Sequence, residues 1–227
     1  MSISIEQVKE LREQTGVSIM QCKKALEEAE GDFDKALIIL KKKSGAAAAK
    51  RAGREAEEGT VVVKSGDSKA VICTLHCETD FVAKNSDFIA LAEDLANNAY
   101  TNGIEAMKEG SAEAIAVGVQ KVGENIKLGD VTEIKGTVIG SYNHNGKSTA
   151  VVALSGGTPD LAKDIAMQLT ALKASYISES EIPQEDKDKA REHFAEELEK
   201  ENKPEEMKAK ILEGKLASYF KDQVLLS

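Results

Sequence analysis

Two cysteines and a histidine, Cys73, His76 and Cys77, have the spacing in this chain that most resembles a metal or thiol site. Side chains on a strand alternate between faces, so Cys73 and Cys77 share one face with Leu75, and His76 lies on the other. A structural zinc site needs four convergent ligands, and the sequence offers no second pair of cysteine and histidine to complete one. The segment therefore predicts two core cysteines, and we expect no metal site, no cofactor and no catalytic residue.

Gly146-Lys147-Ser148 matches the end of a phosphate-binding P-loop. That motif needs a glycine five residues before Gly146, where this sequence has Ser141, and it leads into a helix whose amides hold phosphate. Asn145-Gly146 instead separates two apolar segments and predicts a two-residue hairpin turn. We therefore expect that the chain does not bind nucleotide itself.

Composition excludes several classes of protein. The 227 residues carry a net charge of −9 and only 4% are aromatic, with no tryptophan, which argues against a broad nucleic-acid surface or a base-stacking platform. Three cysteines form no disulfide framework, no apolar run approaches the roughly 18 residues of a membrane span, and Met1–Ser4 lacks the apolar region of a signal peptide. We expect an intracellular, cytoplasmic protein without nucleic-acid or membrane partners.

The first part of the chain predicts a separate module of three short helices, residues 1–45. Residues 1–54 carry a net charge of +3 and the remainder −12, an asymmetry that indicates separate modules. Each predicted helix has a capping residue, an apolar face and a glycine stop. The caps are Ser4, Ser18 and Asp32, and the stops are Gly16, Gly31 and Gly45. Residues 46–58, rich in alanine, lysine and arginine, predict a helical linker closed by Gly59.

A basic cluster lies at the end of this module and in the linker. Its simple interpretation is positive charge at a helix C-terminus followed by a solvated linker face. The alternative is a contact with an acidic protein partner. The cluster consists of Lys41, Lys42, Lys43, Lys50, Arg51 and Arg54.

An internal repeat follows, with copies at residues 59–135 and 136–180 that each predict strand, turn, strand and helix. The first copy carries about nine extra residues, roughly His76–Asn85, between its second strand and its helix. Since the second copy does without these residues, the insert is a candidate binding loop.

Beyond the repeat, residues 181–222 predict a helical hairpin with its turn at Glu201–Pro204, and residues 223–227 a C-terminal tail. The first copy continues through Val131–Ile134 as a third strand. The second copy has no equivalent before Ser227, so we expect an incomplete second subdomain with an exposed sheet edge. Together these elements predict an α+β fold.

Phe81 lies in the insert among polar and charged neighbours, outside any helical or strand spacing. One interpretation is that Phe81 packs with Phe88 at the start of the next helix, and that Asp80 caps that helix. The other is that Phe81 is a presented aromatic wedge, whose burial in a partner pocket would give about 1.5–3 kcal/mol. The pattern alone leaves both interpretations open.

Several ordered blocks of the chain resemble the bacterial-type elongation factor Ts family, the nucleotide exchange factors for elongation factor Tu. The resemblance runs from Ile5 to Leu226, and its central block, Cys77–Ala83, contains the insert. The other blocks are Val8–Arg12 with Thr15-Gly16, Cys22–Leu26, Val122–Ile126 and Ile211–Lys215.

The resemblance implies a ubiquitin-associated-type three-helix domain, a duplicated α+β core and a helical coiled-coil hairpin. It also implies that a loop enters the GTPase near its magnesium site, where Phe81 disturbs the Mg²⁺ and phosphate contacts and promotes GDP release. That loop corresponds to Thr79, Asp80, Phe81 and Val82. The N-terminal domain would grip the partner's nucleotide-binding domain through Lys9, Arg12, Ile19 and Met20. Where the family often has paired methionines, this chain has Ile19-Met20.

On this resemblance the chain is not an enzyme. It would bind elongation factor Tu in its GDP-bound and nucleotide-free forms, and a dimer or higher-order complex remains open. One alternative is an interaction scaffold that uses the ubiquitin-associated-like domain and has no exchange activity. The other is a thiol or metal enzyme that uses Cys73, His76 and Cys77.

Overall fold

The computed structural model describes residues 3–200 and 204–226. Its contacts divide the chain into two units, residues 1–163 and 164–227, and each is considered by itself below. Both units contain helices, and the first contains two antiparallel sheets, so the predicted α+β class is confirmed. Among the described residues, no helix combines the length and the apolar character needed to cross a membrane.

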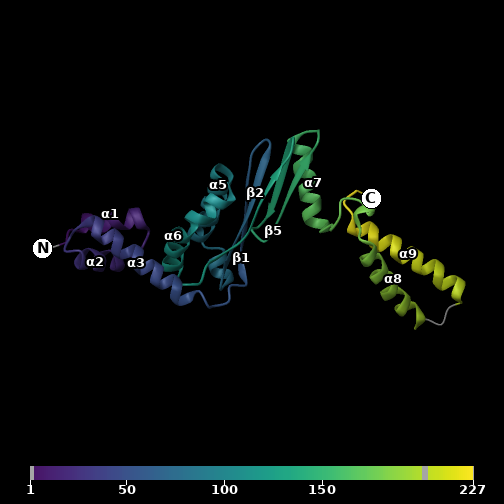
Figure 1. The fold of residues 1–227 in the computed structure, drawn as a ribbon, viewed down its shortest axis with the longest axis horizontal. Coiled ribbons are helices and arrows are strands. Elements are labelled where there is room, and N and C mark those ends of the chain that lie inside the picture. The colour runs from purple at the N-terminus through teal and green to yellow at the C-terminus, as the bar shows by residue number, and fades with distance from the viewer. Residues whose placement is uncertain (1–2, 201–203, 227) are drawn as a thin grey trace. The chain divides into compact units, whose positions relative to one another are not determined.

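The N-terminal bundle consists of α1 (Ile5–Thr15), α2 (Ile19–Glu28) and α3 (Phe33–Arg51) (Figure 1). The predicted capping box is present, because the backbone N–H of Gln7 donates to Ser4 Oγ at 3.1 Å and that of Ser4 donates to Gln7 Oε1 at 3.1 Å. Ser18 and Asp32 cap α2 and α3 as predicted. The apolar faces meet in a core that includes Leu11, Leu26 and Leu40.

The prediction that the third helix stops at Gly45 is wrong. α3 continues through Gly45 to Arg51, because the four alanines that follow favour helix enough to offset one glycine. α3 also packs on α6 (Ile104–Val122), and directly before Gly45 the buried Ser44 hydroxyl hydrogen-bonds Gln120. The predicted helical linker is therefore helical only as far as Arg51, and Gly59 lies inside a strand.

The first copy of the repeat forms a three-stranded antiparallel sheet in the order β1-β2-β3. Its strands are β1 (Glu58–Ser65), β2 (Lys69–Cys77) and β3 (Lys127–Lys135). Helix α5 (Ser86–Asn102) packs on β1 and β2, and α6 packs on α5. Phe88, Leu75 and Met107 are among the fully buried side chains of this core.

The second copy consists of β4 (Val138–His144), β5 (Ser148–Leu154) and α7 (Pro159–Leu172), so the predicted order of strand, turn, strand and helix is confirmed in both copies. Asn145 and Gly146 both have positive φ, +55° and +68°, as the tight turn between paired strands requires. This hairpin lies against the first sheet, since the N–H of Val61 donates to the Gly146 carbonyl at 2.8 Å. In the described residues the second sheet has two strands, β4 and β5.

The second unit holds the end of α7 and the predicted helical hairpin, α8 (Gln184–Glu199) and α9 (Glu205–Gln223), which lie side by side (Figure 1). Leu198 and Leu216 are buried, and Lys215 Nζ pairs with Glu197 at 2.9 Å. Most of the predicted turn, residues 201–203, lies outside the described residues. The tail is paired, since the N–H of Leu225 donates to the carbonyl of Tyr176 at 2.9 Å.

Substitution of Gly140 tests how closely β4 meets the first turn of α7. A Cβ on Gly140 would lie 2.2 Å from the Ala162 carbonyl carbon and 2.3 Å from the Lys163 nitrogen, both backbone atoms that cannot rotate away. Gly140→Ala is expected to destabilise the fold by about 1–3 kcal/mol, which lowers the thermal midpoint by roughly 2–10 °C in calorimetry. Gly156→Ala is the control, because its Cβ would meet no atom within 4 Å. Equal midpoints for the two variants would contradict the close packing.

Candidate functional site

The insert links the end of β2 to the start of α5 through one helical turn, α4 (Asp80–Ala83). Sequence spacing gave no sign of this turn, and His76 and Cys77, counted in the insert, belong to β2. Thr79 caps α4, with its hydroxyl accepting from the N–H of Val82 at 3.4 Å. The insert is therefore a short structured connection rather than an irregular loop.

Phe81 points away from the core. It is 82% exposed, the largest fraction among the strongly exposed large apolar side chains of the described residues. Its neighbours Val82 and Ala83 contact the core that contains Phe88, which is 1% exposed. The interpretation that Phe81 packs with Phe88 is wrong, because Phe81 is exposed and does not belong to the core that buries Phe88.

Asp80 does not cap the next helix. The side chain of Asn85 caps α5, since its Oδ1 accepts from the N–H of Asp87 at 2.9 Å. Asp80 instead pairs with Lys84 at 2.7 Å on the exposed side of α4. The hydrogen bond from Lys84 lowers the pKa of the Asp80 carboxyl, which keeps a negative charge next to Phe81.

Two glutamates hold the start of the insert in place. The Glu124 carboxylate accepts three hydrogen bonds, from the N–H of Glu78 at 3.1 Å, the N–H of Thr79 at 3.0 Å and the hydroxyl of Thr79 at 2.6 Å. In return, the Glu78 carboxylate accepts from the N–H of Asn125 at 2.6 Å. We call this reciprocal arrangement of Glu78, Thr79, Glu124 and Asn125 the carboxylate clasp.

The clasp is tied to the chain that follows α3. Arg54 Nη1 lies 3.3 Å from the Glu78 carboxylate, and the Asn125 side chain, 3% exposed, donates to the Arg54 carbonyl at 2.7 Å. The pKa of Glu78 is lowered, first by the backbone N–H of Asn125 and then by Arg54. The Glu78 carboxyl therefore stays charged at neutral pH and accepts from both the N–H of Asn125 and the guanidinium of Arg54.

Sequence analysis did not find the clasp. Its bonds join Glu78 and Thr79 to residues 45 to 47 positions further along the chain, and no local spacing connects them. The available signal is the glycine stop at Gly123, whose φ of +81° ends α6 and turns Glu124 toward the insert. A glutamate directly after such a glycine is a candidate anchor for a neighbouring loop.

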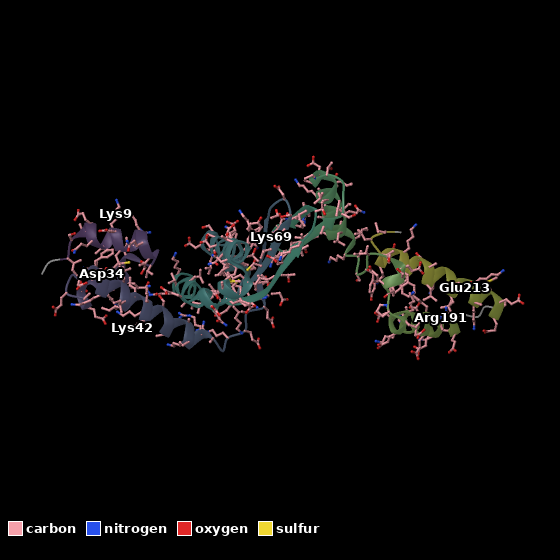
Figure 2. The ribbon with its side chains drawn as sticks, turned by 45° about the horizontal axis from the view of Figure 1, so that its top comes forward. Lys9, Asp34, Lys42, Lys69, Arg191 and Glu213 are labelled. Carbon is pink, nitrogen blue, oxygen red and sulfur yellow. The ribbon has the colours of Figure 1, made fainter. Side chains whose placement is uncertain are left out.

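Three of the four predicted N-terminal residues lie together. Lys9, Arg12 and Ile19 line one groove of about 440 Å³ with Ile5 and Val8, between α1 and α2. Figure 2 shows Lys9 projecting from α1 into solvent. Met20, which is also exposed, lines a neighbouring hollow that shares Arg12 and extends to Gln120 on α6. None of the described residues that line this groove belongs to the insert.

The cysteines lie where the alternation predicts. Cys73, Leu75 and Cys77 are all fully buried, and burial raises the pKa of both thiols to about 11. Thiolates are therefore scarce at neutral pH, which argues against nucleophilic chemistry. Across residues 3–200 and 204–226, no three His, Cys, Asp or Glu side chains are arranged to hold a metal ion.

Comparison with known proteins gives this geometry a family context. The family model for elongation factor Ts matches residues 78–227, starting at the first residue of the clasp. The elongation factor Ts of Hahella chejuensis is 39% identical over 99% of this chain and 81% of its own length. This chain belongs to the elongation factor Ts family. The elongation factors Ts of Chlorobium phaeobacteroides and Hydrogenobaculum sp. are 40% and 37% identical and cover 99% and 100% of the chain.

Membership places the chain among the elongation factors of protein synthesis. The match to the family model contains the whole of α4 and both halves of the clasp, and the N-terminal groove lies before it. The N-terminal segment that forms the groove is therefore linked to the elongation factor Ts family by the relatives, whose similarity extends over nearly the whole chain.

Titration of Glu78 tests which contact lowers its pKa. In a carbon-detected NMR titration, the pKa of Glu78 is expected below the usual range of a glutamate and to rise only partly in Arg54→Gln, because the N–H of Asn125 remains. Because the pKa of Glu78 is lower in the folded chain than in the unfolded chain, its ionisation stabilises the fold at pH values above the unfolded pKa. This contribution is lost as the pH falls through the lowered folded-state pKa.

Lys84→Gln is the control for this titration, since it is expected to raise the pKa of Asp80 and leave that of Glu78 unchanged. If Arg54→Gln returned Glu78 to the ordinary value of a glutamate, the backbone bond would not be the main cause of the shift.

Proposed function

We propose that the chain is a guanine-nucleotide exchange factor for elongation factor Tu, which promotes GDP release by inserting Phe81 near the Mg²⁺ and phosphate site. The observation that carries the proposal is the 82% exposure of Phe81 on an insert whose Thr79 is hydrogen-bonded to Glu124. An aromatic side chain held in water is suited to burial in a partner. Family membership supplies the class of partner.

The mechanism needs no active site in this chain. Bound GDP is held in part by Mg²⁺ and by amides around its phosphates. A wedge that binds the distorted, metal-poor form of the GTPase better than the intact form weakens nucleotide binding by the difference between the two affinities. By reciprocity the nucleotide weakens the binding of the factor by the same amount, so incoming GTP expels it.

Phe81 cannot supply the whole effect. Its burial is worth about 1.5–3 kcal/mol, whereas a 10⁴-fold effect needs roughly 5.5 kcal/mol of differential binding. We propose that the groove of Lys9, Arg12 and Ile19, with Met20 beside it, adds further contact with the nucleotide-binding domain of the partner. Exposed apolar side chains flanked by cationic ones suit an acidic protein surface with apolar patches.

Stopped-flow release of labelled GDP from elongation factor Tu tests the role of Phe81. The intact chain is expected to accelerate release, and Phe81→Ala to reduce the maximal acceleration by about tenfold to a hundredfold, because the wedge contact is lost. The control is Met207→Ala, which truncates another exposed apolar side chain, on α9, and should leave release unchanged. No acceleration by the intact chain would contradict the proposed function.

Truncation of the groove tests its separate contribution. Lys9→Ala combined with Ile19→Ala is expected to lower the maximal acceleration by about tenfold and to raise the concentration for half-maximal acceleration, because the groove supplies part of the differential binding that Phe81 cannot supply alone. The interaction scaffold predicts something different: binding that depends on Ile19 and Met20, with no acceleration of GDP release by any variant.

A further inference from the structure

We infer that Glu124 is a positioning residue for exchange, whose carboxylate fixes the backbone from which Phe81 projects. The inference rests on the proposed function, because it concerns the same insert. Glu124 does not reach Phe81 itself. It acts through Thr79, which accepts from the N–H of Val82 on the far side of Phe81 and donates to Glu124 Oε1 at 2.6 Å.

The insert has little else to orient it. α4 is four residues long, too short to hold a helical conformation by itself. Phe81 and the Asp80–Lys84 pair are exposed, so packing holds only Val82 and Ala83. The entry into α4 is fixed by polar contacts: Glu78 is held by Asn125 and Arg54, the Cys77 thiol donates to the Thr79 carbonyl at 3.2 Å, and Glu124 accepts three hydrogen bonds from Glu78 and Thr79. Of these, the Glu124 bonds alone reach the Thr79 hydroxyl that caps α4.

Glu124 is itself held firmly. It follows Gly123, whose N–H donates to the Val119 carbonyl at 2.9 Å at the end of α6 and whose carbonyl accepts from Arg51 Nε at 2.9 Å. The next residue, Asn125, is buried and bonded to the Arg54 carbonyl. Because the residues on both sides of Glu124 are bonded in this way, the Glu124 backbone is held in place relative to α3 and α6.

The chemistry requires a carboxylate at this position. Glu124 Oε2 accepts from two backbone N–H groups while Oε1 accepts from the Thr79 hydroxyl. A glutamine can offer one oxygen to the N–H pair, but its amide nitrogen then faces Thr79 and can only donate to the hydroxyl oxygen that already accepts from Val82. Glu124→Gln therefore keeps the shape and one acceptor, replaces the bond to a charged carboxylate by a weaker one of opposite direction, and leaves the Thr79 hydroxyl proton without its acceptor.

Glu133→Gln is the matched control. Glu133 lies on β3, and its partly buried carboxylate also accepts hydrogen bonds, from Lys69 at 3.4 Å and from Lys135 at 2.7 Å. The substitution is the same and the Glu133 carboxylate also has two bonded partners, but neither of them belongs to the insert. A general loss of stability from removing a bonded carboxylate would affect both variants.

The first test needs no partner. Nitrogen-15 relaxation gives the order parameter of the amides of Phe81 and Val82, expected near 0.85 in the unmodified chain and below about 0.6 in Glu124→Gln. Glu133→Gln should keep the unmodified value. Order parameters that are equal in all three proteins would overturn the inference, whether or not the chain promotes exchange.

The second test is a double-mutant cycle on GDP release from elongation factor Tu. Glu124→Gln is expected to slow maximal release by roughly tenfold in the unmodified chain and by less than about twofold in the Phe81→Ala background, because Glu124 acts through Phe81. Equal factors in both backgrounds would overturn the inference and leave the proposed function intact. If the unmodified chain gave no acceleration, the proposed function and the exchange role of Glu124 would both be overturned.

Discussion

The presentation of one exposed aromatic side chain depends on a pair of carboxylates that bind each other's backbone. Glu124 accepts from the N–H groups of Glu78 and Thr79, and Glu78 accepts from the N–H of Asn125. These N–H groups lie at the end of β2 and after α6, where neither strand nor helix can pair them. Unpaired groups near a core are costly, so the two glutamates satisfy the backbone and fix its course together. Because the bonds are reciprocal, loss of the Glu124 carboxylate leaves the donors of Glu78 and Thr79 without a partner, and loss of the Glu78 carboxylate leaves the N–H of Asn125 without one.

The duplication explains why this arrangement occurs only in the first copy. In the second copy, β5 ends at Leu154 and α7 begins at Pro159, with room for little more than a capping turn. In the first copy, α6 and β3 follow α5, and the connection between α6 and β3 contains Glu124 and Asn125. The insert and its anchor thus belong to the same additional elements. A strand–turn–strand–helix unit without α6 could contain a similar insert but has no equivalent means of holding it.

The parts of the fold that follow from local chemistry could be predicted from the sequence. The capping box at Ser4, the turn at Asn145-Gly146 and the buried face of Cys73, Leu75 and Cys77 each depend on residues a few positions apart. The continuation of α3 through Gly45 could not be predicted, because it depends on packing of α3 on α6 and on four alanines whose helix propensity offsets a single glycine. The clasp joins residues more than forty positions apart, and the exposure of Phe81 depends on which side of α4 meets the core. Both are properties of tertiary structure.

Because α3 extends past Gly45, it connects the bundle that carries the groove to the elements that hold the insert with Phe81. The helix begins in the bundle that carries the groove, and at its other end Arg51 donates to the carbonyl of Gly123, the residue before Glu124. Along its length Lys41 pairs with Glu113 at 2.7 Å and Ser44 meets Gln120, so α3 is fixed to α6 at several points. A contact at the groove and a contact at Phe81 would then be presented by connected elements rather than by modules on a flexible tether. Less conformational entropy is lost when a second contact forms on elements already held together, so more of the free energy of each contact is available to distort the partner's nucleotide site.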